Sequence, residues 1–308
     1  MLIPSYHTPV MLQACLLGLN LQKDGTYLDL TFGGGGHSRG ILSELGPKGR
    51  LFAFDQDLDA VRNAEALSED KRLSFIRSNF RYLKNWVEYY GIEPDGILAD
   101  LGVSSHHLDA GERGFSFRSD APLDMRMNQK SRLTAARIVT EYSEEQLASV
   151  LRLYGEVKEP GRVARAIVSA RNAEPLETTG ALAEAVSKAL PRDREKKELA
   201  KVFQALRIEV NGEMKALGEM LQQAAEVLKP GGRLVILSYH SLEDRLVKNM
   251  IRSGNIEGRT EQDLYGRTRS PLRAVDKGVA TPDDGEINEN PRARSAKLRV
   301  AEKVNEQE

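Results

Sequence analysis

Apolar positions in the first third of the chain form short runs of strand-forming residues, separated by stretches with helical periodicity. The runs TYLDLTF, RLFAFDQD, RLSFIRSNF and DGILADLGVSS predict four strands. Between them, SRGILSELG, LDAVRNAEALSED and RYLKNWVEYYG predict helices, and Gly46 closes the first of these. Such alternation is typical of a parallel sheet with helices on both faces, which predicts a doubly wound α/β fold.

The alternation stops after the fourth strand, and residues 131–228 contain only helical patterns. They include the capping box SEEQ and the stretches EPGRVARAIVSARN, TGALAEAVSKAL, EKKELAKVFQALRIEV and EMKALGEMLQQAAEVL. GRLVILSYHS predicts the next strand, and AKLRVAEKV a late one. A simple crossover between strands rarely needs so many residues. We therefore predict an all-helical subdomain, residues 110–212, inserted between two parts of one α/β core, residues 1–109 and 213–308.

Composition is that of an ordinary soluble globular protein. The chain has 308 residues, 40% hydrophobic and 29% charged, with a net charge of -1. No global field attracts nucleic acid, so any nucleic-acid surface must be a local patch. The single cysteine, Cys15, excludes an internal disulfide and a Cys-rich zinc site, and its apolar surroundings predict a core position. The N-terminal stretch lacks signal-peptide features and no apolar run approaches membrane-spanning length, so we expect a cytoplasmic protein.

A run of four glycines in DLTFGGGGHS lies between a predicted strand and a predicted helix, which argues against a flexible linker. Glycines there let the backbone approach a ligand, and the helix start offers N–H groups. Asp55 ends the second strand about 20 residues later, where Rossmann-type sites place a ribose-binding carboxylate. A ligand-free turn is the simpler alternative. The spacing fits both a dinucleotide and S-adenosylmethionine (SAM), and Asp29, which would repel pyrophosphate, favours SAM without deciding.

Seven motifs, which include the glycine run, occur in one order along the chain. They are TFGGGGHS, DLGVSSHHLD, RGFSFR, PLDMRM, FQALRIEVN, SYHSLEDR and RSAKLR. Together they resemble the bacterial 16S ribosomal RNA (cytosine-N4)-methyltransferase family (MraW-like) over nearly the whole chain. The resemblance implies a class I SAM-dependent methyltransferase, with a Rossmann-like sheet and an inserted helical domain. It also implies methylation of the N4 amine of a cytidine in the decoding region of small-subunit ribosomal RNA.

The same resemblance implies the partners and the cofactor contacts. The partner would be 16S ribosomal RNA or the small ribosomal subunit, and neither DNA nor a membrane; a homodimer is compatible with the sequence but does not follow from it. Gly35, Gly36 and His37 would wrap the methionine part of SAM, and Asp55 would bind the ribose hydroxyls. Phe80, expected at the end of the third strand, would lie by the adenine. A polar helix-start role for His37 and a core role for Phe80 are the simpler alternatives.

Asp100, at the end of the fourth strand, is the predicted catalytic residue. The N4 amine is a poor nucleophile because its lone pair is delocalised into the ring. A carboxylate can accept hydrogen bonds from the amine and stabilise positive charge that develops on it, and the carbonyls of Leu101 and Gly102 can share this task. A loop-capping role is the alternative. The last implied cofactor contact falls on His107, where family members are expected to carry Gln.

The base and the RNA backbone need further partners. DLGV lacks the aromatic residue that many amino-methyltransferases stack on a flipped base, so we assign stacking to Phe115, Phe117 or Tyr239. Tyr239 belongs to a polar cluster in which Asp244 and Arg245 can form a structural ion pair. Cationic stretches for phosphate binding are RDREKKELAK, RGFSFRSDAPLDMRM, RTRSPLR and PRARSAKLR, although each can instead be a solvated face. Few acids offset the favoured phosphate contacts, which are Arg267, Arg269 and Arg273.

Two other functional classes fit parts of the pattern. An NAD-dependent oxidoreductase would share the sheet and the glycine loop, but the loop is an imperfect GxGxxG and no acid/base for hydride transfer can be assigned. A non-catalytic RNA-binding or assembly factor would keep the fold without the chemistry. No His/Cys/Asp/Glu cluster has metal-ligand spacing, so we predict no essential catalytic metal.

Overall fold

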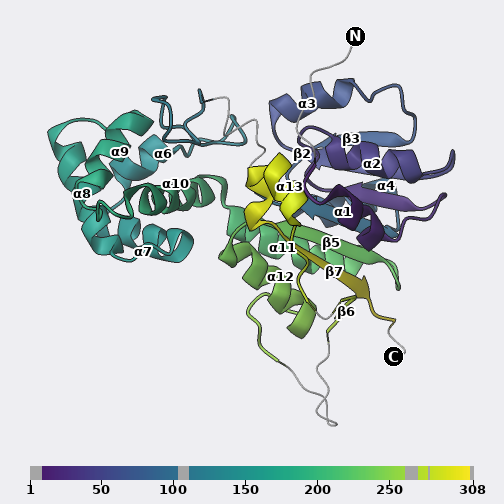
Figure 1. Cartoon of the computed structure of the whole chain (residues 1–308). Helices are drawn as coiled ribbons and strands as arrows, with labels where there is room; N and C mark the ends of the chain where they lie inside the picture. The colour runs from purple at the N-terminus through teal and green to yellow at the C-terminus, as the bar shows by residue number, and fades with distance from the viewer. Residues whose placement is uncertain (1–8, 103–110, 261–269, 277, 306–308) are drawn as a thin grey trace. The chain divides into compact units, whose positions relative to one another are not determined.

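The computed structural model describes residues 9–102, 111–260, 270–276 and 278–305. The chain divides into two compact units, which are labelled by element in Figure 1. The first unit combines Met1–Gly102 with Met214–Glu308, and the second is Val103–Glu213. The helical insert expected over residues 110–212 falls within the second unit.

A seven-stranded sheet in the order β3-β2-β1-β4-β5-β7-β6 forms the centre of the first unit (Figure 1). Strands β1 to β5 run parallel, whereas β7 is antiparallel to both β5 and β6. The strand order reverses between β1 and β4, which is where a doubly wound sheet binds its ligand. The predicted α/β fold is confirmed. The strands are β1 Thr26–Asp29, β2 Arg50–Asp55, β3 Leu73–Arg77, β4 Gly96–Asp100, β5 Arg233–Ser238, β6 Leu272–Ala274 and β7 Lys297–Lys303.

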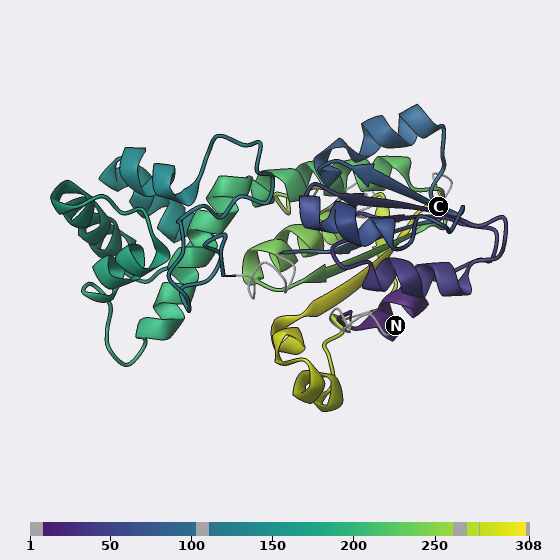
Figure 2. The same ribbon diagram turned by 90° about the horizontal axis from the view of Figure 1, so that it is seen from above.

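Both faces of this sheet are covered by helices (Figure 2). Successive strand residues point to opposite faces, so Tyr27 packs in one apolar cluster with residues of α1 and α2, while Leu28 packs in another with α4, α11 and α12. Cys15 of α1 is fully buried in the first cluster, as predicted. The helices are α1 Leu12–Leu19, α2 Gly36–Glu44, α3 Leu58–Glu65, α4 Leu83–Tyr90, α11 Glu213–Val227, α12 Ser241–Ser253 and α13 Asp284–Glu289, with short 3-10 turns η1 Phe80–Tyr82 and η2 Pro291–Ser295.

The second unit, as far as its residues are described, consists of five helices around one apolar core. Each helix contributes fully buried side chains, among them Ile138, Leu151, Ile167, Leu182 and Leu206. The predicted capping box is present, since Ser143 and Gln146 each accept a hydrogen bond from the other's backbone N–H. The helices are α6 Ala135–Glu141, α7 Glu144–Gly155, α8 Pro160–Ala173, α9 Thr179–Ser187 and α10 Glu195–Asn211.

Several elements were not predicted from the sequence. Helix α6 is only seven residues long and is capped by Thr134, whose side chain accepts a hydrogen bond from the N–H of Arg137. Helix α12 begins shortly after β5, with His240 as its N-cap. The sequence analysis treated SYHSLEDR as a polar cluster and did not predict that most of it is the start of this helix. Strand β6 is three residues long, and α1 is apolar on most of its surface. Short length hid α6 and β6, and weak periodicity hid α1. Helix α12 is 13 residues long and amphipathic, and it was missed because its polar start was interpreted only as a strand-end cluster.

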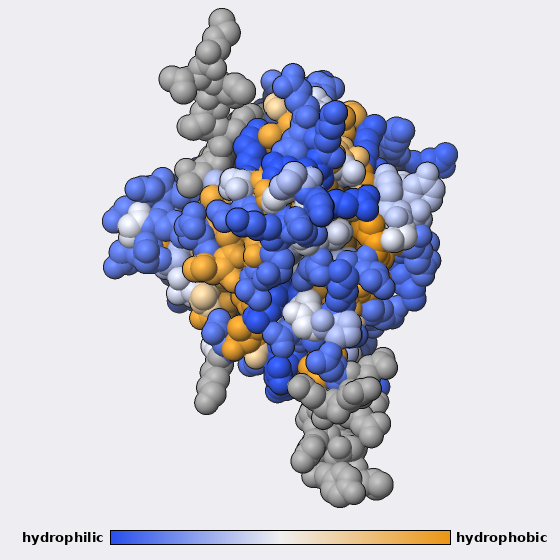
Figure 3. Space-filling model, turned by 90° about the vertical axis from the view of Figure 1, so that its right-hand side faces the viewer, coloured by the Kyte–Doolittle hydropathy of each residue, from blue (hydrophilic) through white to orange (hydrophobic). Residues whose placement is uncertain are grey.

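One face of the molecule is mostly polar. Figure 3 shows charged and polar side chains over most of the face in view, with smaller apolar areas between them. The longest described helix, α10, has 17 residues, and none of the helices among the described residues is long and apolar enough to cross a bilayer.

Candidate active site

Three aspartates end three parallel strands of the first unit. Asp29, Asp55 and Asp100 are the last residues of β1, β2 and β4. Tyr239 directly follows β5, and β5 pairs in register with β4 through Leu237 and Asp100. The carboxyl ends of parallel strands share one edge of the sheet, so these side chains surround the point where the strand order reverses.

The glycine run forms the turn from β1 into α2. Gly33 and Gly35 have φ angles of 50° and 76°, a conformation that side chains disfavour. A Cβ at Gly35 would lie 2.7 Å from the ring of Phe32, and one at Gly36 would lie 3.0 Å from Pro9. Helix α2 starts at Gly36, so its first backbone N–H groups lie at the loop. This conformation suits a backbone that must pass close to a ligand.

Asp55 fixes this loop and retains acceptor capacity. Its Oδ2 accepts a hydrogen bond from the N–H of Gly33 at 2.8 Å, and its Oδ1 accepts one from the N–H of Asp57 at 2.9 Å. The side chain of Asn63 also donates to the carbonyl of Gly33. Each carboxylate oxygen has two lone pairs, and Asp55 is only partly buried. The carboxylate can therefore accept further hydrogen bonds from a pair of ribose hydroxyls, as SAM requires.

Asp29 is a buried support of the glycine turn. Its side chain is 1% exposed and accepts hydrogen bonds from the hydroxyl of Ser38 at 2.6 Å and from the N–H of Thr31 at 3.1 Å. Burial raises the pKa of Asp29, and these hydrogen bonds together with the nearby ring of His37 counteract the rise. The carboxylate supports the turn from inside the protein. The preference for SAM over a pyrophosphate that its charge was expected to give stays a prediction.

Phe80 is not a strand-end residue. Strand β3 ends at Arg77, and Phe80 begins the 3-10 turn η1. The side chain of Asn79 caps this turn by accepting a hydrogen bond from the N–H of Arg81, and it also donates to Gln56, which follows β2. The ring of Phe80 is partly buried against the apolar cluster of α4 and α11. One face of the ring is thus supported by the core, as an adenine platform needs, and its contact with the cofactor stays a prediction.

Asp100 is held from several sides. Its backbone N–H donates to the hydroxyl of Thr31 at 2.6 Å, and its Oδ1 accepts a hydrogen bond from the hydroxyl of Tyr239 at 2.7 Å. Nδ1 of His37 lies 3.7 Å from Oδ2, and the Asp100 side chain is 25% exposed. Burial raises its pKa, His37 and Tyr239 counteract the rise, and the charge of Asp29 adds to it. The carboxylate is oriented and still accessible, which suits the catalytic role predicted from the sequence.

Tyr239 is engaged with the catalytic carboxylate. Besides the hydroxyl contact, its backbone N–H donates to Oε2 of Glu243 at 2.9 Å. Burial and the neighbouring carboxylate of Asp100 raise the pKa of the phenol, so its hydroxyl keeps its proton and acts as a donor. The sequence analysis had offered this ring for stacking on a base. The hydroxyl contact instead favours a role in orienting Asp100.

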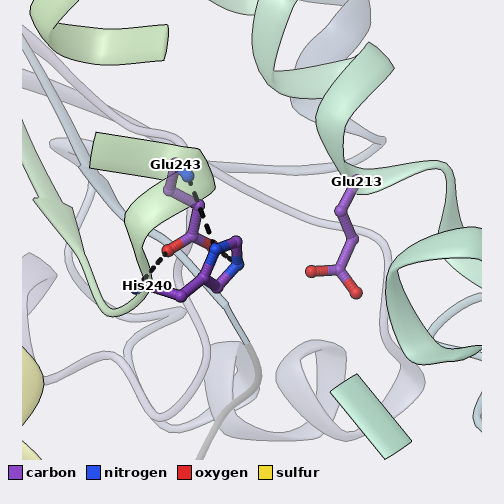
Figure 4. A group of neighbouring side chains, drawn as sticks. All are labelled: Glu213, His240 and Glu243. Carbon is purple, nitrogen blue, oxygen red and sulfur yellow. Dashed lines mark hydrogen bonds and ion pairs between the residues drawn. The ribbon is translucent and has the colours of Figure 1, made fainter. Parts of the chain in front are cut away.

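Glu243 supports the turn that carries Tyr239, and its role was missed in the sequence. Its carboxylate is almost completely buried and lies 3.1 Å from Nε2 of His240. Figure 4 shows the two side chains turned toward each other. The two residues form a capping box at the start of α12. The signal was present in the sequence, because a Glu three residues after a cap position is a helix-start pattern, although His is an unusual cap residue. Asp244 pairs with Lys297 and Arg299 of β7 rather than acting at the site.

Two rings predicted to stack on the base belong to the helical unit. Phe115 is 6% exposed and packs in the core of that unit, so stacking on a base through this ring is disfavoured. Phe117 is partly buried, with its ring edge-to-face with that of Phe203 at 5.4 Å. Of the two, Phe117 has the more accessible side chain. Burial could not be deduced from RGFSFR, because the alternation of the two rings fits either orientation.

The arginines of RGFSFRSDAPLDMRM divide into structural and exposed ones. Arg126 makes two hydrogen bonds to the carboxylate of Asp124 and donates to the carbonyls of Gln129 and Ser131. Arg113 donates to the carbonyls of Arg126 and Met127. These two side chains build the loop before α6, so they are not the phosphate contacts that the stretch was expected to supply. Arg118 is exposed.

Of the remaining predicted site residues, only Arg273 lies in the part of the chain that the structure describes. His107, Arg267 and Arg269 lie outside the described residues. Arg273 lies in β6, pairs with Glu302 of β7 at 3.0 Å and has a side chain that is 61% exposed. Such a guanidinium can also face a phosphate, so its assignment stays a prediction.

Comparison with known proteins identifies the family. The MraW methylase family profile matches residues 4–304. The chain belongs to the MraW methylase family. It is 58% identical over 300 residues to "Ribosomal RNA small subunit methyltransferase H" of Bacteroides thetaiotaomicron, covering 97% of this chain and 98% of the relative. It is 53% identical over 300 residues to the protein of that name from Flavobacterium johnsoniae, with 97% and 98% covered. The family resemblance, the methyltransferase class and SAM as the methyl donor are thereby confirmed.

Proposed function

We propose that this MraW methylase transfers a methyl group from SAM to the N4 amine of a cytidine in the decoding region of small-subunit ribosomal RNA, in the cytoplasm. The observation that carries the proposal is the position of Asp100. It ends β4 at the point where the strand order reverses, and its partly exposed carboxylate accepts a hydrogen bond from Tyr239 while Thr31 accepts one from its backbone N–H. The relatives' names, which specify small-subunit ribosomal RNA, support the substrate class.

The cofactor would be held by the glycine loop and Asp55. The loop backbone at Gly35 and Gly36 would contact the methionine part, and the Asp55 carboxylate the ribose hydroxyls. Phe80 would supply an apolar surface for the adenine. When bound, SAM supplies an electrophilic methyl group on a positively charged sulfur. The protein's task is to place the amine in line with that group and to exclude other nucleophiles.

Asp100 would accept hydrogen bonds from the amine and later its proton. A carboxylate that accepts an N–H bond localises the nitrogen lone pair, and its charge stabilises the cation that develops on nitrogen. Tyr239 orients the carboxylate and Thr31 holds the backbone N–H of Asp100, so little reorganisation is needed during the reaction. The backbone carbonyls of Leu101 and Gly102, which follow in the chain, are candidates for a second acceptor.

RNA binding is assigned to the inserted helical subdomain and the basic C-terminal segment. The net charge of -1 gives no overall attraction to RNA, so local cations must supply it. Arg118 and Arg273 are exposed and suited to phosphates, and Phe117 is the more accessible of the two candidate stacking rings in the helical unit. Arg267 and Arg269 complete the proposed set.

The test is methyl transfer from labelled SAM to small ribosomal subunits that lack the modification, followed by nucleoside analysis. We expect N4-methylcytidine at one decoding-region site from the wild-type chain, and none from Asp100→Asn, which keeps the size of the side chain without its charge. Thermal shift with SAM, its demethylated product and NAD checks the cofactor, because only a bound ligand stabilises the fold. Methylation of another base, or on carbon or oxygen, would refute the proposal.

A further inference from the structure

His37 lies between two acceptor groups in the interior of the first unit. Its side chain is almost completely buried. Nε2 is 3.0 Å from the carbonyl oxygen of Val10, and Nδ1 is 3.7 Å from Oδ2 of Asp100. A carbonyl oxygen can only accept a hydrogen bond, so Nε2 must carry a proton. In the neutral ring Nδ1 then carries none, and its lone pair faces a carboxylate oxygen.

The groups around this ring are mainly acidic. The carboxylates of Asp29 on β1 and Asp100 on β4 interact electrostatically with the ring. The carboxylate of Glu243 on α12, the buried thiol of Cys15 on α1 and the phenol of Tyr239 interact in turn with Asp100. Burial raises the pKa of Asp29 and of Asp100, and the attraction of each carboxylate to His37 counteracts this rise. Nδ1 of His37 therefore faces the carboxylate of Asp100. The ring is an acceptor placed directly behind the catalytic carboxylate.

We propose that His37 is the final acceptor of the proton that the target amine releases, and that Asp100 passes this proton on to it. The inference rests on the proposed function. When the amine nitrogen forms its bond to the methyl carbon, the carbon–sulfur bond breaks and the sulfur becomes a neutral thioether. The nitrogen then has one proton too many. Its N–H bond breaks, the proton passes to Oδ2 of Asp100, and from there to Nδ1 of His37, so that Asp100 is again a carboxylate.

The proposed relay explains why the His37 ring is held at Nε2, on the side away from Asp100. The bond to Val10 fixes the tautomer that leaves Nδ1 open, in the way that a second partner fixes the ring in other histidine acids and bases. Tyr239 occupies Oδ1 of Asp100, which leaves Oδ2 for the exchange. The separation of 3.7 Å must shorten to the hydrogen-bonding range of about 2.7–3.2 Å for transfer. Catalytic hydrogen bonds often tighten only when the substrate is bound.

Two substitutions separate proton transfer from simple positioning. His37→Gln can keep a donor to the Val10 carbonyl but has nothing at the Nδ1 position, whereas His37→Asn keeps a polar group near Nδ1 that cannot take the proton. With SAM and ribosomal subunits in a single-turnover assay, both variants should transfer the methyl about 100-fold more slowly. Because His37 is also an expected cofactor contact, the affinity of each variant for the demethylated cofactor is measured by calorimetry, and the rates are compared with SAM at a saturating concentration. The acid side of the pH–rate profile should lose one ionisation in both.

Wild-type rates in His37→Gln, or restoration by His37→Asn, would overturn the relay, since a positioning role needs only a polar group. A second measurement needs no variant and no turnover. Long-range proton–nitrogen NMR of ¹⁵N-histidine protein should show His37 with its proton on Nε2 and an Nδ1 that titrates. A ring with its fixed proton on Nδ1 and a bare Nε2 would refute the proposal. Failure of the wild-type chain to methylate the RNA would instead refute the proposed function, because the NMR result does not depend on it.

Discussion

The hydroxyl of Tyr239 lies 2.7 Å from Oδ1 of Asp100 and donates a hydrogen bond to it. These two residues are separated by 139 positions in the chain, yet they follow neighbouring parallel strands, β4 and β5. Hydrogen bonds to a charged group are worth about 1.5–3 kcal/mol. The contact therefore has the strength to orient the carboxylate, and it makes Tyr239 a positioning residue of the candidate centre.

Substitution of Tyr239 by Phe should slow methyl transfer roughly tenfold, as expected from the loss of one hydrogen bond to a charged group. The affinity for SAM should stay unchanged, because only the hydroxyl is removed. The measurement is kcat and KM for SAM on ribosomal subunits. Tyr89→Phe is the control, since Tyr89 is 75% exposed and its hydroxyl should not matter. An unchanged kcat would contradict the orienting role; because phenylalanine keeps the ring, stacking is tested separately by Tyr239→Leu, which should then raise the KM for RNA.

Replacement of Asp55 by Ala should weaken SAM binding by at least about tenfold. The change removes the proposed ribose acceptor and also the acceptor for the Gly33 N–H, so the glycine loop loses a contact. Calorimetry with the demethylated cofactor reads the affinity directly. Asp59→Ala on helix α3 is the matched control, because it removes a nearby carboxylate outside the proposed site. Equal affinities for the two variants would contradict the assignment.

Asp244 should make the stability of the first unit depend on acid pH. Burial raises its pKa, but hydrogen bonds from Arg299 and Lys297 outweigh this effect, so the pKa lies below the usual value. A lowered folded-state pKa contributes stability above the unfolded-state pKa of about 4, and this contribution is lost as pH falls through the folded-state value. Asp244→Asn should therefore lower Tm at pH 7, by the equivalent of about 2 kcal/mol. The difference from wild type should shrink towards pH 3, and a constant difference would contradict the ion-pair explanation.

Arg126 and Arg118 should respond to substitution in opposite ways. Arg126→Ala removes bonds to Asp124 and to two carbonyls, so it should destabilise the helical unit by about 2 kcal/mol. Arg118→Ala should leave Tm unchanged but weaken RNA binding and reduce its salt dependence, as loss of a phosphate contact does. Thermal unfolding and filter binding at several salt concentrations measure both effects. A salt-dependent binding loss in Arg126→Ala with unchanged Tm would reverse the two roles.

The strand–helix pattern was enough to predict the sheet and the insertion, because buried parallel strands are apolar runs and their helices are periodic. The strand-end positions of Asp55 and Asp100 followed from the same pattern. The pairing of Tyr239 with Asp100 could not be predicted, since it depends on β5 lying beside β4 in the correct register. The burial of Asp29 was missed for a similar reason: its partner, Ser38, approaches only when the glycine turn folds.

Side-chain orientation in loops was the other limit. RGFSFR and PLDMRM contain arginines and aromatic residues that suit RNA, but Arg126 and Phe115 are engaged within the helical unit. Loops have no fixed period, so a sequence does not show which of their side chains point inward.

Because the core is split in the sequence, the two sides of the candidate centre are synthesised at different times. Asp100 is made before the helical unit, whereas Tyr239 and the strand that carries it are made after that unit. Met11, whose neighbour Val10 holds the ring of His37, donates its N–H to Glu286, which is made later still. A nascent chain on the ribosome therefore lacks both supports until its last segments emerge, and helices of the insert can fold while the candidate centre is still incomplete. We therefore expect the chain to transfer a methyl group only after its synthesis is complete.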